Sequence, residues 1–205
     1  MNILQITSSL RGEQSESNRV ANSIVAKLVA ANPNASVVTR DLARQPHPQL
    51  DEAALGALFT PAESRTAEQS ARVALDDALI AQVQAADVVV IGAPMYNFSI
   101  PSTLKAWIDR VAVAGRTFKY TENGPVGLAG GKRVIIASSR GGIYTDSPAD
   151  FQEPFLRQVF AFMGINEIEF VRAEGIAYSP QHREDAIAGA LAALPSHEAA
   201  EPVAA

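Results

Sequence analysis

Short apolar runs alternate with stretches of helical periodicity along most of the chain. The runs at 2–7, 87–91 and 132–138 are predominantly apolar, as in strands buried on both faces of a sheet, whereas those at 35–39 and 166–172 are shorter or mixed. Strands that alternate with helices pair in parallel, and the mixed runs belong at the edges. The pattern predicts an α/β fold with a doubly wound, five-stranded parallel sheet of order 2-1-3-4-5 and helices on both faces.

The stretches between these strands carry apolar residues at helical spacing, which gives each predicted helix one buried face. A helix after the third strand begins at Pro101, whose fixed φ is already helical, and Ser99 is predicted to cap it. Residues 1–195 are expected to form one domain, and the Ala/Pro/Glu-rich tail at 196–205 is expected to be disordered. The other helices are predicted at about 19–31, 51–58, 62–86, 150–163 and 183–194.

The loop Met95-Tyr96-Asn97-Phe98 follows the third strand and precedes the helix at Pro101. Open α/β sheets bind ligands at the carboxyl ends of their strands, so this loop is predicted to line a binding crevice. Tyr96 and Phe98 are large apolar side chains in a short loop, where polar residues are usual. They suggest a flat aromatic ligand.

The loop after the first strand is rich in hydroxyl groups and leads into a helix. Unpaired N–H groups and the positive end of the dipole at a helix N-terminus favour an anion. Ser9, Ser15, Ser17 and Asn18 add side-chain donors, which would suit a phosphate monoester. The alternative is that Ser15 or Ser17 only caps the helix. The chain has neither GxGxxG nor GxxxxGK[ST], so a mononucleotide phosphate remains.

Two further segments are candidates for ligand contact. Ser139-Arg140-Gly141-Gly142 follows the fourth strand, and its glycines either let backbone N–H groups approach a ligand or only make a turn. This segment is not GxSxG, so a hydrolase nucleophile is not supported. The excursion at 115–128 is too long for a simple connection and carries Phe118 and Tyr120. It is either a binding loop or lid, or a segment whose rings pack on its own core.

Composition limits the chemistry. The net charge is −5 and no Lys/Arg cluster is present, which argues against nucleic-acid binding. The chain has no cysteine, so redox chemistry requires a bound cofactor. No metal site is predicted, because His47 has no partner at metal-ligand spacing and is interpreted as a loop residue. Neither a signal-peptide pattern nor an apolar run of membrane-span length is present, so a soluble, cytoplasmic protein without membrane contact is expected.

The three strand-end loops are predicted to meet at one crevice. The first suits a phosphate, the second an aromatic ring system and the third the polar edge of a ring. Flavin mononucleotide (FMN) meets all three demands. On reduction, the backbone N–H groups of Asn97, Gly141 and Gly142 are candidate donors to the negative charge that develops on the ring.

The segments 15–18, 92–101, 117–125 and 139–142 resemble those of the bacterial FMN-dependent NADH-azoreductases, also described as FMN-dependent NADH:quinone oxidoreductases. The resemblance implies a flavodoxin-like fold and a homodimer with one non-covalent FMN per subunit near the dimer interface. It extends from the first strand to about Tyr178. The FMN contacts of the family fall on Ser9, Ser15, Glu16, Ser17, Met95, Tyr96, Asn97, Phe98, Ser139, Arg140, Gly141 and Gly142.

Two of these positions, together with Tyr144, affect the charge of the site and its substrate preference. The family motif often has glutamine where this chain has Glu16, so Glu16 is expected to point to solvent and to contribute only its backbone N–H. Arg140 either adds positive charge near the flavin or pairs with a carboxylate elsewhere. Tyr144 follows the third loop and is expected to affect substrate preference rather than flavin chemistry.

The resulting hypothesis is a ping-pong cycle. NADH delivers hydride to flavin N5, and a quinone or an aromatic azo compound then takes two electrons at the same site, so no catalytic side chain is required. No basic residue can be assigned to a 2′-phosphate, which favours NADH, although the choice between NADH and NADPH stays open. The chief alternative is a flavodoxin-type electron carrier that serves a protein partner, and a second is a flavin-free interaction module. The substrate pocket is predicted to contain Phe118, Tyr120, Tyr144 and Phe162, completed by the second subunit.

Overall fold

The sheet of the computed structural model has the predicted order. The structure describes residues 1–193, and its five parallel strands are arranged β2-β1-β3-β6-β7. Numbering the strands of this sheet along the chain gives 2-1-3-4-5, as the apolar and mixed runs predicted. The strands are β1 (Asn2–Thr7), β2 (Ser36–Asp41), β3 (Val88–Pro94), β6 (Arg133–Ser139) and β7 (Glu167–Ala173).

Burial explains this order. Every residue of β3 is buried, and in β6 all but the first residue are buried. In β2 the first four residues are exposed, and β7 mixes exposed, intermediate and buried positions. Strands with apolar residues on both faces need covering helices on both sides, and only interior strands have them. The two strands with the least continuous apolar runs therefore lie at the edges.

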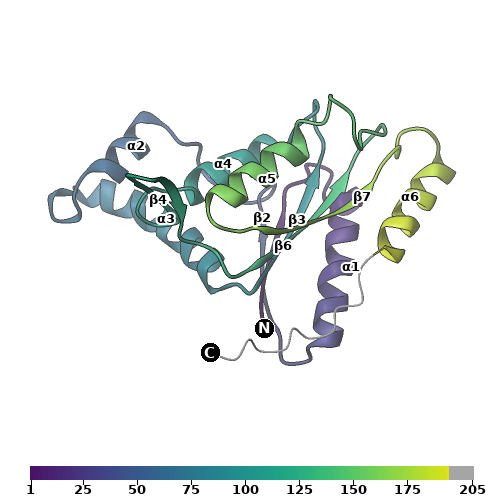
Figure 1. The fold of residues 1–205 in the computed structure, drawn as a ribbon, viewed down its shortest axis with the longest axis horizontal. Helices are drawn as coiled ribbons and strands as arrows, with labels where there is room; N and C mark the ends of the chain where they lie inside the picture. The colour runs from purple at the N-terminus through teal and green to yellow at the C-terminus, as the bar shows by residue number, and fades with distance from the viewer. Residues whose placement is uncertain (194–205) are drawn as a thin grey trace.

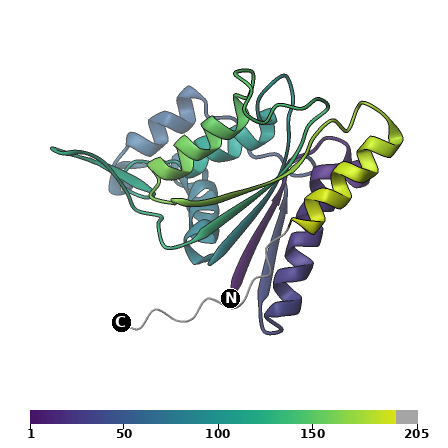
Figure 2. The same cartoon turned by 45° about the vertical axis from the view of Figure 1, so that its right-hand side comes forward.

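Helices cover both faces of the sheet (Figures 1 and 2). On one face, α1 (Glu16–Ala31) and α6 (Pro180–Ala192) bury Ile24, Leu28 and Ile187 against the strands. On the other face, Trp107 and Phe160 are central to the core. This second layer contains α3 (Ala67–Ala85), α4 (Ser102–Val111) and α5 (Gln152–Phe162), and α2 (Glu52–Phe59) packs on α3.

The starts of α1 and α3 and the cap of α4 differ from the prediction. The first helix begins at Glu16 rather than near residue 19, because the Ser15 side chain caps it. The helix predicted at 62–86 is divided: a 3-10 turn at Ala62–Ser64 precedes α3, which starts after Thr66. Thr66 and Gln69 form a capping box there. The prediction that Ser99 caps α4 is wrong, since the N-cap position is Pro101 and has no side-chain cap.

The excursion at 115–128 is a β-hairpin of β4 (Phe118–Thr121) and β5 (Gly124–Gly127). It projects from the body of the molecule on the side of α3 and α5 (Figure 2). The return strand is fixed to the end of α5, because the N–H of Ala129 donates to the carbonyl of Met163 at 2.9 Å.

None of the helices within the described residues is long and apolar enough to cross a membrane. The predicted end of the last helix at 194 and the predicted tail at 196–205 lie outside the described residues. A domain boundary at 195 therefore stays a prediction.

Candidate functional site

A cavity of about 200 Å³ lies at the carboxyl ends of β1, β3 and β6. All three predicted loops contribute to its lining, together with the segment that follows β7. Topology brings them together, since parallel strands end on the same edge of the sheet. The lining residues are Ser9, Arg11, Ser15, Glu16, Pro94, Met95, Tyr96, Ser139, Gly141, Ile176, Ala177 and Arg183.

The first loop presents the N-terminus of α1 to this cavity. The Ser15 hydroxyl accepts the N–H of Asn18 at 3.2 Å and lies 3.1 Å from the Ser17 hydroxyl. Ser15 thus caps the helix and also lines the cavity, so a contact between its side chain and a phosphate stays a prediction. Ser17 is fully buried and its side chain does not line the cavity. In the described part of the chain, the N–H groups of Glu16 and Ser17 donate to no acceptor. They are the free first-turn donors that an anion at a helix N-terminus would use.

Glu16 does not point to solvent as expected. Its side chain is only 13% exposed, and its carboxylate lies 3.9 Å from both Arg19 and Arg183. Nearby cations stabilise a carboxylate that lines a partly buried cavity, because they offset its negative charge. The expectation was wrong because Arg183 comes from α6, far along the sequence.

Tyr96 joins the first loop to the second. Its hydroxyl accepts the N–H of Leu10 at 3.2 Å and lies 3.4 Å from the Ser9 hydroxyl. Deeper in the structure, the Ser8 hydroxyl donates to the carbonyl of Gly92 at 2.7 Å. These contacts fix the ends of β1 and β3 relative to each other on the cavity side.

The second loop is a tight turn held in a rare conformation. Tyr96 and Ser99 exchange backbone hydrogen bonds at 2.9 and 3.1 Å, and the two residues between them, Asn97 and Phe98, have φ of 49° and 69°. Asparagine adopts positive φ more readily than most residues, whereas for phenylalanine the conformation is strained. Phe98 is 49% exposed, and its ring meets that of Tyr144 edge to face at 6.0 Å. Such strain concentrates at binding sites.

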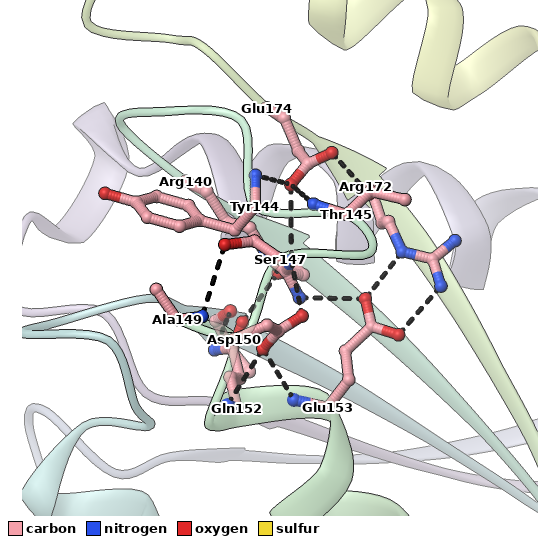
Figure 3. Close-up of polar contacts among 12 residues, drawn as sticks. Arg140, Tyr144, Thr145, Ser147, Ala149, Asp150, Gln152, Glu153, Arg172 and Glu174 are labelled. Atoms are coloured by element: carbon pink, nitrogen blue, oxygen red, sulfur yellow. Dashed lines mark hydrogen bonds and ion pairs between the residues drawn. The ribbon is translucent and has the colours of Figure 1, made fainter.

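The third loop is anchored by a buried arginine (Figure 3). The Arg140 side chain is 0% exposed and pairs with Asp150 at 2.8 Å, Glu153 at 2.8 Å and Glu174 at 3.2 Å. The second alternative for Arg140 is therefore the correct one: its charge is taken up by carboxylates. These ion pairs fix the backbone that leads into Gly141 and Gly142.

Gln152 couples the third loop to the second. The Arg140 Nε donates to the Ser138 hydroxyl at 2.9 Å, and that hydroxyl donates to the Gln152 carbonyl oxygen at 2.8 Å. The Gln152 amide in turn donates to the backbone carbonyls of Ala93 and Pro94 at 3.1 and 3.2 Å. All these groups are buried, so the chain of hydrogen bonds holds the ends of β3 and β6 in one arrangement. The sequence indicated Gln152 only as a helix residue.

Glu174 holds the far end of the third loop (Figure 3). Its carboxylate accepts the N–H groups of Tyr144 and Thr145 at 2.8 and 3.0 Å and the Thr145 hydroxyl at 2.5 Å. Burial raises the pKa of Glu174, but the hydrogen bonds from Thr145 and Tyr144 and the charge of Arg140 outweigh it and bring the pKa below its usual 4.5. The carboxylate thus stays ionised and keeps the loop closed, while the N–H groups of Gly141 and Gly142 have no acceptor within residues 1–193.

The four predicted pocket residues are not brought together within one chain. Phe118, Tyr120 and Phe162 form one aromatic cluster, with ring centroids 4.3 Å apart for Phe118 and Phe162. Tyr144 packs on Phe98 instead. The reason is the length of α5: Gln152 at its start donates to the carbonyl of Pro94, which lines the cavity, whereas Phe162 at its end lies about 15 Å along the axis, at 1.5 Å per residue.

His47 is a loop residue, as interpreted, but it has a buried partner. Its Nε2 lies 3.2 Å from Asp76, whose same oxygen accepts from the Arg110 Nε at 2.6 Å. This cluster ties the loop after β2 to α3 and α4, away from the cavity. Among residues 1–193, no group of His, Asp and Glu side chains is arranged to hold a metal ion.

A family model described as the flavodoxin-like fold matches residues 1–197. The FMN-dependent NADH:quinone oxidoreductase of Stenotrophomonas maltophilia (strain K279a) is 67% identical to this chain over 205 residues, which is 100% of both chains. The chain belongs to this oxidoreductase family. The predicted family and fold are confirmed.

Solved structures similar to this oxidoreductase agree with the assignment. The azoreductase from Bacillus anthracis str. Sterne has a TM-score of 0.86 and 32% identity, and the match covers 94% of this chain and 95% of that one. A FMN-dependent NADH-azoreductase from Bacillus anthracis str. Ames Ancestor, solved in complex with FMN, has a TM-score of 0.84 and 27% identity over 94% and 97% of the two chains.

Proposed function

We propose that this chain is an FMN-dependent NADH:quinone oxidoreductase that also cleaves aromatic azo compounds, with FMN bound in the cavity at the carboxyl ends of β1, β3 and β6. The observation that carries the proposal is that three separate loops line this one cavity, where the backbone N–H groups of Glu16 and Gly141 have no acceptor within residues 1–193. The names of the similar proteins, one an FMN-dependent quinone reductase and one an azoreductase in complex with FMN, support it.

The residues present fit the chemical parts of FMN. The N–H groups of Glu16 and Ser17 and the side chains of Ser9 and Arg11 would hold the phosphate at the start of α1. Met95 and Tyr96, which line the cavity, would lie along the ring system, and Asn97 and Phe98 follow them in the same turn. The N–H groups of Asn97, Gly141 and Gly142 would face the polar edge of the ring, where they stabilise negative charge without reorganisation.

FMN supplies a carrier of two electrons, so the chain needs no nucleophile and no acid–base residue of its own. The task of the chain is to fix the loops that hold the ring. The Arg140–Ser138–Gln152 hydrogen bonds and the Glu174 carboxylate do this from behind the cavity. In the proposed ping-pong order, NADH and the acceptor use the same exposed surface in turn.

The acceptor pocket is proposed to form between two copies of the chain. Tyr120 is 72% exposed at the projecting hairpin, and neither it nor Phe118 nor Phe162 lines the cavity of its own chain. Large exposed aromatics on a projecting segment are typical of interaction surfaces. A homodimer would bring this cluster beside Phe98 and Tyr144 of the other copy. A cytoplasmic location stays a prediction from the sequence.

Anaerobic mixing with NADH tests the proposed activity. The protein loaded with FMN is expected to lose its visible flavin absorption on addition of NADH and to regain it on addition of a quinone. NADH mixed with an equal amount of free FMN, without protein, is the control. If dithionite reduces the bound flavin but NADH and NADPH do not, the electron-carrier alternative takes the place of this proposal.

Tyr120→Ala tests the acceptor pocket. Loss of the ring is expected to raise the KM for quinones and azo dyes by about tenfold, from the lost apolar and aromatic contact. The affinity for FMN should change little, because Tyr120 does not line the cavity. Phe162→Ala should have the same effect on the acceptor, and unchanged acceptor kinetics in both variants would remove these residues from the pocket.

A further inference from the structure

Two side chains at the phosphate end of the cavity come from different parts of the chain and carry opposite charges. Glu16 is the first residue of α1, and Arg183 lies in the first turn of α6. Both line the cavity, and the Arg183 Nε lies 3.9 Å from the Glu16 carboxylate. The two residues lie far apart in the sequence, from which only the first loop is predicted to contact a phosphate.

The carboxylate of Glu16 works against an anion in this position. It adjoins the N–H groups that would hold a phosphate, and two negative charges in a partly buried cavity repel each other. With Arg11 as the single cation of the lining besides Arg183, the charges of Arg11 and Glu16 would cancel. Arg183 gives the lining its net positive charge.

Arg183 is held at the cavity and yet retains free donors. Its Nε donates to the carbonyl of Ile176 at 3.2 Å, which fixes the side chain against the segment after β7. Its side chain is 38% exposed, and its terminal guanidinium nitrogens have no partner within the described residues. A guanidinium with free donors matches a phosphate, which accepts two parallel hydrogen bonds.

Arg19 provides a contrast on the same carboxylate. It also lies 3.9 Å from Glu16, but it does not line the cavity and its guanidinium is paired with Glu184 at 3.3 Å. The two arginines thus have equal distances to Glu16 and different access to a ligand.

We propose that Arg183 is the phosphate-recognition residue of this chain, and that it offsets Glu16 so that the site selects a phosphorylated flavin. The inference rests on the proposed binding of FMN in this cavity. In this proposal a residue of α6 discriminates between FMN and riboflavin, which differ only in the phosphate. This helix lies at the opposite end of the chain from the first loop.

The experiment compares the affinities of the full-length, flavin-freed protein for FMN and for riboflavin, each followed by quenching of flavin fluorescence. Arg183→Met is expected to weaken FMN binding by about tenfold, the loss of one charge-assisted contact, and to change riboflavin binding less than about twofold. Glu16→Gln is expected to tighten FMN binding severalfold. The double variant restores the net charge of the lining and should bind FMN within about threefold of the original protein.

Two matched variants test whether the effect depends on the charge of Arg183 and on its place in the cavity. Arg183→Lys retains the charge and should keep most of the preference for FMN. Arg19→Met removes a neighbouring cation outside the cavity and should leave both affinities within about twofold of the original. Thermal melting of each variant identifies any that fails to fold.

The outcomes separate this inference from the proposed function. If the original protein binds neither flavin, the proposed function is wrong. If it prefers FMN and Arg183→Met retains that preference, or loses affinity for both flavins equally, Arg183 is not the phosphate-recognition residue while the proposed function stands.

Discussion

Replacing Arg140 by methionine is expected to lower the free energy of unfolding by about 3 kcal/mol. The side chain is fully buried and pairs with three carboxylates, so its removal leaves Asp150 and Glu174 with fewer partners in a site closed to water. Methionine fills much of the volume but provides no donor. Arg140 also donates to the Ser138 hydroxyl, so one hydrogen bond of the chain that connects the third loop to the second is lost as well.

Urea unfolding at neutral pH measures this loss, and an acid titration tests its cause. The depressed pKa of Glu174 means that its contribution to stability is present above its usual value of 4.5 and is lost as the pH falls through the lower, folded-state pKa. Without Arg140 that folded-state pKa rises, so the acid unfolding midpoint should move to higher pH. Affinity for FMN should fall in parallel.

Arg44→Met is the control for loss of a cation. Its side chain is 74% exposed and lies 3.7 Å from Asp41, so its removal should change the free energy of unfolding by no more than about 0.5 kcal/mol. If Arg140→Met behaves like Arg44→Met, the buried cluster does not hold the third loop.

Gly127→Ala is expected to destabilise the protein by about 3 kcal/mol, the upper part of the range for an overpacked core. A Cβ at residue 127 would lie 2.1 Å from the backbone N of Gly164 and 2.3 Å from the carbonyl carbon of Met163. Both are backbone atoms at the end of α5 and cannot move as a flexible side chain would. The hairpin must therefore separate from α5, which also displaces Phe118 from Phe162.

Gly56→Ala is the matched control, because the same substitution there is expected to raise the free energy of unfolding instead of lowering it. Gly56 lies in α2 with ordinary φ, and nothing lies within 4 Å of the added Cβ. Alanine should stabilise the helix by about 0.5–1 kcal/mol. Thermal or urea unfolding of both variants provides the comparison, and equal stability of Gly127→Ala and the original protein would contradict the close approach of hairpin and helix.

The order of the sheet could be predicted because the apolar or mixed composition of each run indicates how deeply that strand is buried. Runs such as Val88–Ile91 are apolar at every position, which only an interior strand explains, and the mixed run that contains Glu167 and Glu169 indicates an edge. Two local signals were present but missed. Thr66 and Gln69 have the spacing of a capping box, and Asn123-Gly124 between alternating residues is a turn signal for the hairpin.

The candidate site could be predicted only as far as it is built from loops that follow strands. Ser9, Tyr96 and Gly141 were found because the fold places every strand end at one edge. The partners of Arg140 were not found, since they lie 10, 13 and 34 residues away and no periodicity connects them. The same holds for Arg183, which reaches the cavity only because α6 folds back beside α1.

The place of β1 in the middle of the sheet has a consequence for how the chain folds. The strand made first pairs with β2 at Ser36–Asp41 on one side, but its other neighbour begins only at Val88. Synthesis proceeds at about 5–20 residues per second, so the edge of β1 that pairs with β3 is without its partner for several seconds. Contacts so distant along the chain slow folding and leave an apolar strand edge open to other chains in the interval. We therefore expect aggregation during synthesis to depend on how quickly residues 42–94 emerge.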